Sequence, residues 1–171
     1  MAIYVVDSNF FIQAHRDYYP LDVTFSFWDK VKRLAESGLI ISIDKVREEL
    51  YTNKKEEEKD ELEKWCRANL SNDFFKDTSQ IMTSYGQVSN WAVSKSGQYT
   101  PAAINEFLGV DEADAFVISY ALSDLNNRIV VTQEVSSPDS KKSIKIPDVC
   151  IAFNIPVMNT IQMFRNLGET F

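Results

Sequence analysis

The sequence has little histidine and cysteine, and it carries no excess of positive charge. Its single histidine, His15, leaves little material for a Ser-His or Cys-His catalytic triad or for a histidine-rich metal site. The two cysteines, Cys66 and Cys150, lie far apart with no C-x-x-C pattern, which excludes a zinc ribbon and fits a reducing environment. With 18 basic and 25 acidic residues the net charge is −7, which excludes a strongly basic scaffold that coats nucleic acid.

The sequence also lacks a targeting signal and a long apolar run. The apolar opening Ile3–Val6 reaches an acid at Asp7, too early for the apolar region of a signal peptide. No uninterrupted apolar run approaches the ~20 residues that a membrane span needs. We therefore expect a cytoplasmic protein that does not associate with a membrane.

Length and composition indicate one globular domain. The chain has 171 residues, of which 44% are hydrophobic and 25% are charged, an ordinary globular composition. At this size, folding buries roughly 70% of the surface that the unfolded chain exposes. No repeat or low-complexity linker divides the chain, so we expect a single domain over residues 1–171.

Short apolar segments alternate with segments of helical periodicity. Buried-type strands are predicted at Ile3–Val6, 39–42, 128–132 and 156–158. Helices are predicted at 23–38, 44–51, from about 72 to 94, from Pro101 with Thr100 as N-cap, at 111–125, after Pro147 and at 160–167. This alternation predicts an α/β protein, a three-layer α/β/α sandwich with a mostly parallel central sheet.

The segment from about 54 to 96 begins with a run of charged residues. Almost every residue from Lys54 to Lys64 is charged, which is typical of a solvated helix face. We expect a helical, charged insertion or a lid at 54–96. Apolar side chains between Asn72 and Trp91 are candidates for contact with a partner or a second subunit, and core packing is the alternative.

Acidic residues recur where the strands end. Asp7 follows the first strand, Glu48 and Glu49 lie one or two helical turns beyond the second, and Glu134 lies two residues past the strand that ends at Thr132. Asp114 lies in the first turn of an apolar helix. Because ligands bind outside the carboxyl ends of parallel strands, a shared cleft is expected there.

Each acid taken alone also has a structural interpretation. Asp7 could cap the following helix, and Asp114 could favour the positive end of its own helix. Glu49 could be a surface residue of an acidic helix, and Glu134 could have a purely structural role. The combination carries more weight than any single residue, since carboxylates crowded in a low dielectric repel one another unless a cation neutralises them.

Hard oxygen ligands select Mg²⁺ or Mn²⁺ rather than zinc. Such an ion lowers the pKa of bound water, polarises a phosphoryl oxygen and stabilises the leaving oxygen. The acids Asp7, Glu49, Asp114 and Glu134 therefore suit hydrolysis of a phosphodiester without a histidine or a covalent nucleophile.

Four ordered motifs carry a resemblance to a known family. They are Val5–Asn9, Val46–Leu50, Asp111–Ala115 running into Ile118–Ala121, and Val130–Glu134. In order, spacing and flanking apolar residues they resemble the motifs of a PIN domain, over essentially the whole chain. The closest resemblance is to bacterial single-domain PIN proteins, including the VapC-type toxins of toxin–antitoxin pairs.

This resemblance implies Mg²⁺- or Mn²⁺-dependent cleavage of RNA and an antitoxin protein as partner. It assigns the metal-holding, catalytic positions to Asp7, Glu49, Asp114 and Glu134, and the small polar positions that order the cleft to Ser8, Asn9 and Thr132. In the second motif Glu49 is favoured over Glu48, because the family's acid precedes an aliphatic residue and Leu50 follows Glu49. The fourth acid of the family is usually Asp, so Asp139 is the alternative to Glu134.

An acidic cleft needs positive charge nearby to hold a polyanion. Lys141 and Lys142, with Lys145, follow Glu134 closely and are candidates to contact phosphates, a solvated loop being the alternative. No RNA-binding module is recognisable, so the RNA target stays open, as do the number of metal ions and the oligomeric state.

Three other classes compete with the ribonuclease. A degenerate PIN fold would act as a non-catalytic binding or regulatory module. A haloacid-dehalogenase-like phosphatase would want D-x-D after the first strand, where this chain has Asp7-Ser8-Asn9. A flap-endonuclease-type enzyme would want a helix–turn–helix-like DNA clamp after the core, and none follows.

Overall fold

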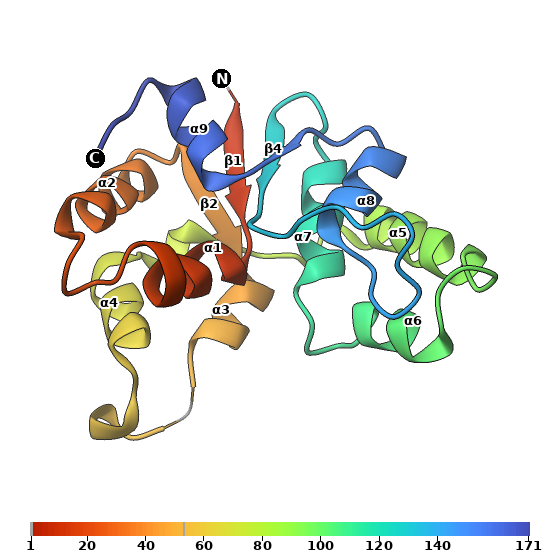
Figure 1. Ribbon diagram of the computed structural model, residues 1–171, viewed down its shortest axis with the longest axis horizontal. Helices are drawn as coiled ribbons and strands as arrows, with labels where there is room; N and C mark the ends of the chain where they lie inside the picture. The colour runs from red at the N-terminus through yellow and green to blue at the C-terminus, as the bar shows by residue number, and fades with distance from the viewer. Residues whose placement is uncertain (1, 53) are drawn as a thin grey trace.

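The protein is an α/β sandwich built on one parallel sheet (Figure 1). The computed structural model describes residues 2–52 and 54–171. The five strands follow the order β3-β2-β1-β4-β5, and every neighbouring pair is parallel. They are β1 (Ile3–Val6), β2 (Ile40–Ile43), β3 (Phe75–Lys76), β4 (Arg128–Val131) and β5 (Val157–Met158). The predicted fold class is confirmed, and the sheet is parallel throughout.

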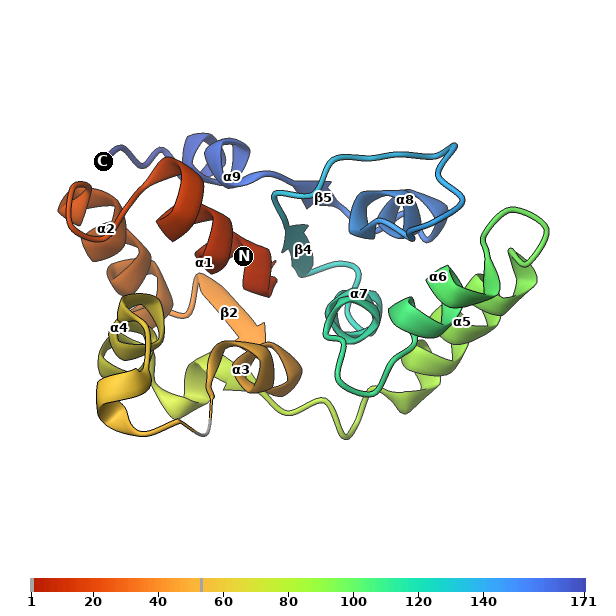
Figure 2. The same ribbon diagram turned by 60° about the horizontal axis from the view of Figure 1, so that its bottom comes forward.

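Helices cover both faces of the sheet. They are α1 (Ser8–Gln13), α2 (Phe25–Glu36), α3 (Asp44–Leu50), α4 (Glu61–Asn69), α5 (Met82–Ser94), α6 (Pro101–Phe107), α7 (Asp114–Leu122), α8 (Ile146–Ala152) and α9 (Thr160–Leu167), with a π-helical turn at Ala14–Tyr18 and 3-10 turns at Glu56–Glu58 and Asn72–Phe74. Figures 1 and 2 agree in placing α1, α2 and α4 on one side of the sheet and α5, α7 and α8 on the other. Within the described chain, no helix combines the length and apolar character that crossing a bilayer requires.

The core forms around β1, the middle strand. Val5 and Val6 are fully buried, because β1 pairs with a strand on each side and is covered by helices on both faces. Val5 lies opposite Ile41 of β2 and Val130 of β4. A wholly apolar strand is the pattern expected of a strand with two covered faces.

Helix α7 is apolar on every side and is buried as its sequence predicts. All its residues from Ala115 to Ala121 are buried, because α7 packs against the sheet on one side and against α5 on the other. The ring of Phe116 stacks on Tyr85 of α5 at a centroid distance of 4.5 Å. This double packing fixes the position of Asp114 at the start of α7.

The segment 54–96 differs from the helical expectation. The helix predicted from Asn72 is wrong at its start: a 3-10 turn and strand β3 come first, and α5 begins only at Met82. Strand β3 pairs with β2, so this segment contributes to the central sheet. The helix predicted at 111–125 spans only Asp114–Leu122.

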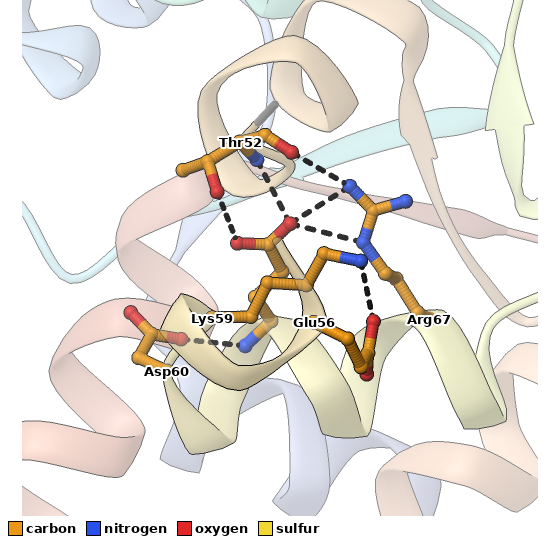
Figure 3. A network of polar contacts seen from close by, with 6 residues as sticks. Thr52, Glu56, Lys59, Asp60 and Arg67 are labelled. Atoms are coloured by element: carbon orange, nitrogen blue, oxygen red, sulfur yellow. Dashed lines mark hydrogen bonds and ion pairs between the residues drawn. The ribbon is translucent and has the colours of Figure 1, made fainter. Parts of the chain in front are cut away.

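A polar network fixes the start of α4 (Figure 3). Glu63 is 3% exposed, and its carboxylate accepts hydrogen bonds from the backbone and hydroxyl of Thr52 and from the guanidinium of Arg67. Burial acts to raise the pKa of Glu63, but these hydrogen bonds outweigh it and lower that pKa. Asp60 caps α4 by accepting from the backbone N–H of Glu63 at 2.7 Å. A buried charge is thus fully partnered.

Candidate functional site

The strand order reverses at β1. This strand lies between β2 and β4, and the chain runs outward to β3 before it returns to β4 on the other side of β1. In open parallel sheets, ligands bind outside the carboxyl ends of the strands at such a switch point. Asp7 follows β1 directly and therefore lies there.

Asp7 is held rigidly and is 1% exposed. As N-cap of α1 it accepts the backbone N–H of Phe10 on Oδ1 at 2.8 Å, and the hydroxyl of Thr132 donates to Oδ2 at 2.6 Å. Burial is the largest effect on the pKa of Asp7 and raises it, as do the charges of Glu134 and Glu49, while the two hydrogen bonds lower it. The net result is a pKa of about 7. Asp7 therefore caps α1, which is the structural role that the sequence allowed for it. Its raised pKa is also typical of a carboxylate that lacks a counterion.

Glu49 and Glu48 point in different directions from α3. Glu49 is half-buried, and its Oε1 accepts the backbone N–H of Ala113 at 2.8 Å, just before α7 begins. Glu48 pairs with Lys45 at 3.1 Å on the outside, with 58% of its side chain exposed. Successive helical residues are about 100° apart, so only one of the two faces the site.

Asp114 opens α7 and is half-buried. Burial, and to a smaller extent the charges of Glu134, Asp7, Glu49 and Glu112, together raise the pKa of Asp114 to about 8. Within residues 2–52 and 54–171, no hydrogen bond or ion pair to its carboxylate offsets these effects. The other three predicted acids, Asp7, Glu49 and Glu134, are all among the charges that raise the pKa of Asp114.

Glu134 has two firm partners. Its Oε2 accepts the backbone N–H of Ile146 at 2.8 Å, and its Oε1 pairs with Nζ of Lys145 at 3.1 Å. Its own backbone N–H donates to the hydroxyl of Thr132 at 3.1 Å. Across the described residues, Glu134 is the one member of the four that forms an ion pair.

The small polar positions lie around Asp7. Thr132 is buried and connects the two segments, since its hydroxyl donates to Asp7 and accepts from Glu134. Ser8 is buried and Asn9 is half-buried in the first turn of α1.

The basic loop residues lie outside this cluster. Lys141 and Lys142 are exposed, and so is Asp139. The loop is fixed near these residues by Gln98, whose amide donates to the carbonyl of Pro138 at 2.7 Å. The pKa values of Asp7 and Asp114 respond to Glu134, and Asp139 is not among the charges that raise them.

A cavity of about 80 Å³ lies beside the cluster. Its walls come from α6, the start of α7 and the segment 143–145, and its charged lining residues are Glu106, Glu112, Asp114, Glu134 and Lys145. Burial, together with the charge of Glu49, raises the pKa of Glu112 above its ordinary value. The site is therefore strongly acidic, with Lys145 as a cation at its wall.

Comparison with known families matches residues 4–171 to the model of a domain of unknown function, DUF4411. The chain belongs to the DUF4411 family. No curated protein and no solved structure matches it.

The donor set fits a hard divalent cation by its chemistry. All four predicted side chains offer carboxylate oxygens, and burial with mutual repulsion raises the pKa of both Asp7 and Asp114. In the described part of the chain, however, no three His, Cys, Asp or Glu side chains are arranged so that they could hold an ion.

Two features of the site were not apparent from the sequence. Glu106 lines the cavity, although nothing in its helical segment singles it out. Lys145 pairs with Glu134, eleven positions earlier in the sequence, and this contact depends on how the loop between them folds. The sequence signal near this contact is Pro147, which marks the start of α8 directly after Lys145.

Proposed function

We propose that this protein is a Mg²⁺- or Mn²⁺-dependent endoribonuclease of the PIN type. One observation carries the proposal: four segments bring Asp7, Glu49, Asp114 and Glu134 into one electrostatic environment at the switch point of the sheet. Mutually repelling buried carboxylates are typical of sites that bind a cation. The ordered PIN-like motifs add the substrate class, RNA, and the role of a toxin with an antitoxin partner.

Asp7, Glu49 and Asp114 are the residues that would hold the ion. When bound, a divalent ion activates water and stabilises charge on the phosphoryl group. The chain keeps these carboxylates in place: Thr132 and the N–H of Phe10 orient Asp7, and the N–H of Ala113 orients Glu49. Among the residues that the structure describes, neither oxygen of the Asp114 carboxylate has a hydrogen-bond partner, which leaves both available to an ion or a water molecule. Such fixed orientation of ligands is what supporting hydrogen bonds supply.

A non-catalytic binding module is the second candidate. The ion pair of Glu134 with Lys145 favours it, because an ammonium group already neutralises one of the four acids. The lack of a preformed metal-holding group among the described residues favours it as well. Such a module would keep the fold of the nuclease but would not cleave RNA.

Cleavage of a mixed RNA pool separates the two candidates. Purified wild type and Asp7→Asn are incubated with Mg²⁺, Mn²⁺ or EDTA, with Asp139→Asn as an exposed acidic control. If the protein is an endoribonuclease, wild type and Asp139→Asn should cut RNA in a metal-dependent manner, and Asp7→Asn should not cut it. Absence of cutting together with no thermal shift on adding Mn²⁺ would favour the binding module.

A further inference from the structure

Lys145 lies where a substrate phosphate would need positive charge. It lines the cavity together with Asp114 and Glu134, and 33% of its side chain is exposed. Lys141 and Lys142 of the same loop are exposed, and neither lines the cavity. Among the three lysines of this loop, Lys145 is therefore the one placed beside the acidic cluster.

Glu134 fixes Lys145 in this place. One oxygen of its carboxylate accepts the N–H of Ile146, and the other pairs with the ammonium group of Lys145. Since Ile146 begins α8 and is itself fully buried, the carboxylate has a rigid anchor. The side chain of Glu134 is 12% exposed, so the ion pair is shielded from water on one side. These contacts suit a positioning role for Glu134 better than direct ligation of a metal.

The charge balance of the cavity determines when it accepts an anion. Its lining holds four carboxylates, from Glu106, Glu112, Asp114 and Glu134, against the one ammonium of Lys145. An anion entering without a cation would meet net repulsion. A divalent ion on the neighbouring acids weakens this repulsion and offers the anion a positive charge, and Lys145 supplies a second, directional positive charge. Lysine binds phosphate in this manner, as a point charge.

We propose that this cavity is the binding site of the scissile phosphate group, with Lys145 as the residue that contacts it and Glu134 as the residue that positions Lys145. The inference rests on the proposed metal-dependent function. It differs from the resemblance to PIN domains in one assignment, because it takes Glu134 out of the metal-holding set.

Binding of adenosine 5′-monophosphate to the full chain tests the site without any cleavage. Affinity is measured by calorimetry with and without saturating Mn²⁺, and uncharged adenosine is the comparison ligand. Wild type should bind the monophosphate only with Mn²⁺ present. Lys145→Gln should weaken this binding about tenfold, the loss expected for one hydrogen bond to a charged group. Lys145→Arg should retain most of it.

The matched control is Lys64→Gln. Lys64 pairs with Glu61 at the same 3.1 Å separation, but on α4. Lys64→Gln removes the same charge from the chain as Lys145→Gln does. An equal loss of affinity in these two variants would therefore overturn the proposal. Equal affinity of wild type and Lys145→Gln would overturn it too.

Glu134→Gln separates positioning from metal ligation. The proposal predicts that this variant binds Mn²⁺ alone within about threefold of wild type while its affinity for the monophosphate falls. A tenfold or greater loss of Mn²⁺ affinity would overturn the assignment of Glu134. Wild type that binds Mn²⁺ but no monophosphate would overturn the phosphate site alone, whereas wild type that binds no Mn²⁺ would overturn the proposed function and this inference with it.

Discussion

At the scale of single residues, the four acids differ in how they are neutralised. Asp7 accepts two hydrogen bonds from neutral donors, and Glu49 accepts one. Glu134 forms an ion pair with the ammonium group of Lys145. Asp114 accepts none among the described residues, and its pKa of about 8 is higher than the pKa of about 7 of Asp7. Asp114 is therefore the residue where removal of a negative charge should have the clearest effect.

Asp114→Asn should stabilise the metal-free protein at pH 8 and abolish cleavage. Because the pKa of Asp114 is raised from 3.8 to about 8 in the folded chain, the folded state binds more protons than the unfolded state between these values. The stability that the protonated group contributes is present at acid pH and is lost as the pH rises toward 8. Without this carboxyl, the melting temperature in EDTA should rise by about 2–4 °C at pH 8.

Thermal melts in EDTA from pH 5 to pH 8 check this prediction. The wild-type melting temperature should fall more steeply with pH than that of Asp114→Asn, and Asp139→Asn should follow wild type. Parallel curves for wild type and Asp114→Asn would show that Asp114 does not carry the raised pKa.

Glu49→Gln should reduce cleavage by about tenfold or more, whereas Glu48→Gln should leave it within about twofold of wild type. Glutamine keeps the acceptor for the N–H of Ala113, so the loss would come from the missing charge. Glu48 points outward to Lys45 and makes a matched control on the same helix. Initial cleavage rates with Mn²⁺ provide the comparison, and equal losses in the two variants would contradict the role of Glu49.

At the scale of elements, the acids Glu63 of α4 and Asp114 of α7 differ in how they are partnered. On α4, Glu63 has full partners and a lowered pKa, which is typical of a structural charge. On α7, Asp114 has a raised pKa and no hydrogen-bond partner within the described part of the chain, which is typical of a functional charge. The two helices lie on opposite sides of the sheet (Figure 2).

Glu63→Gln should destabilise the fold and leave cleavage unchanged. The variant loses a charge-assisted bond to Arg67, which costs about 1–3 kcal/mol in unfolding free energy. Urea denaturation measures this loss, with Glu61→Gln as the exposed control on the same helix. If Glu63→Gln lowers the cleavage rate under conditions where the variant is fully folded, α4 contributes to the site.

The sequence predicts the elements with a strong local pattern. Residues Ile3–Val6 form a strand as expected, and Thr100 caps α6 by accepting from the backbone N–H of Ala103. Strand β3 is missed because its two residues are too few to show a period, and only pairing with β2 makes it a strand. At the site, the helical spacing that separates Glu48 from Glu49 is readable in advance. The ion pair of Lys145 with Glu134 is not, since a loop conformation creates it.

At the scale of the whole molecule, the sheet order explains why acids distant in sequence meet. Asp7 and Glu134 follow the adjacent strands β1 and β4, while Glu49 and Asp114 lie on α3 and α7 next to them. The net charge of −7 means that an RNA substrate must be held by local positive charge at the site. Contacts with an antitoxin or a second subunit stay predictions from the resemblance and from the 72–91 segment.

The most direct measurement is a crystal structure of the protein with Mn²⁺, with data collected at the manganese absorption edge. We expect an anomalous peak bounded by the carboxylates of Asp7, Glu49 and Asp114, and no peak at this position in Asp114→Asn. A wild-type crystal in millimolar Mn²⁺ with no peak among these carboxylates would show that they do not form a metal site.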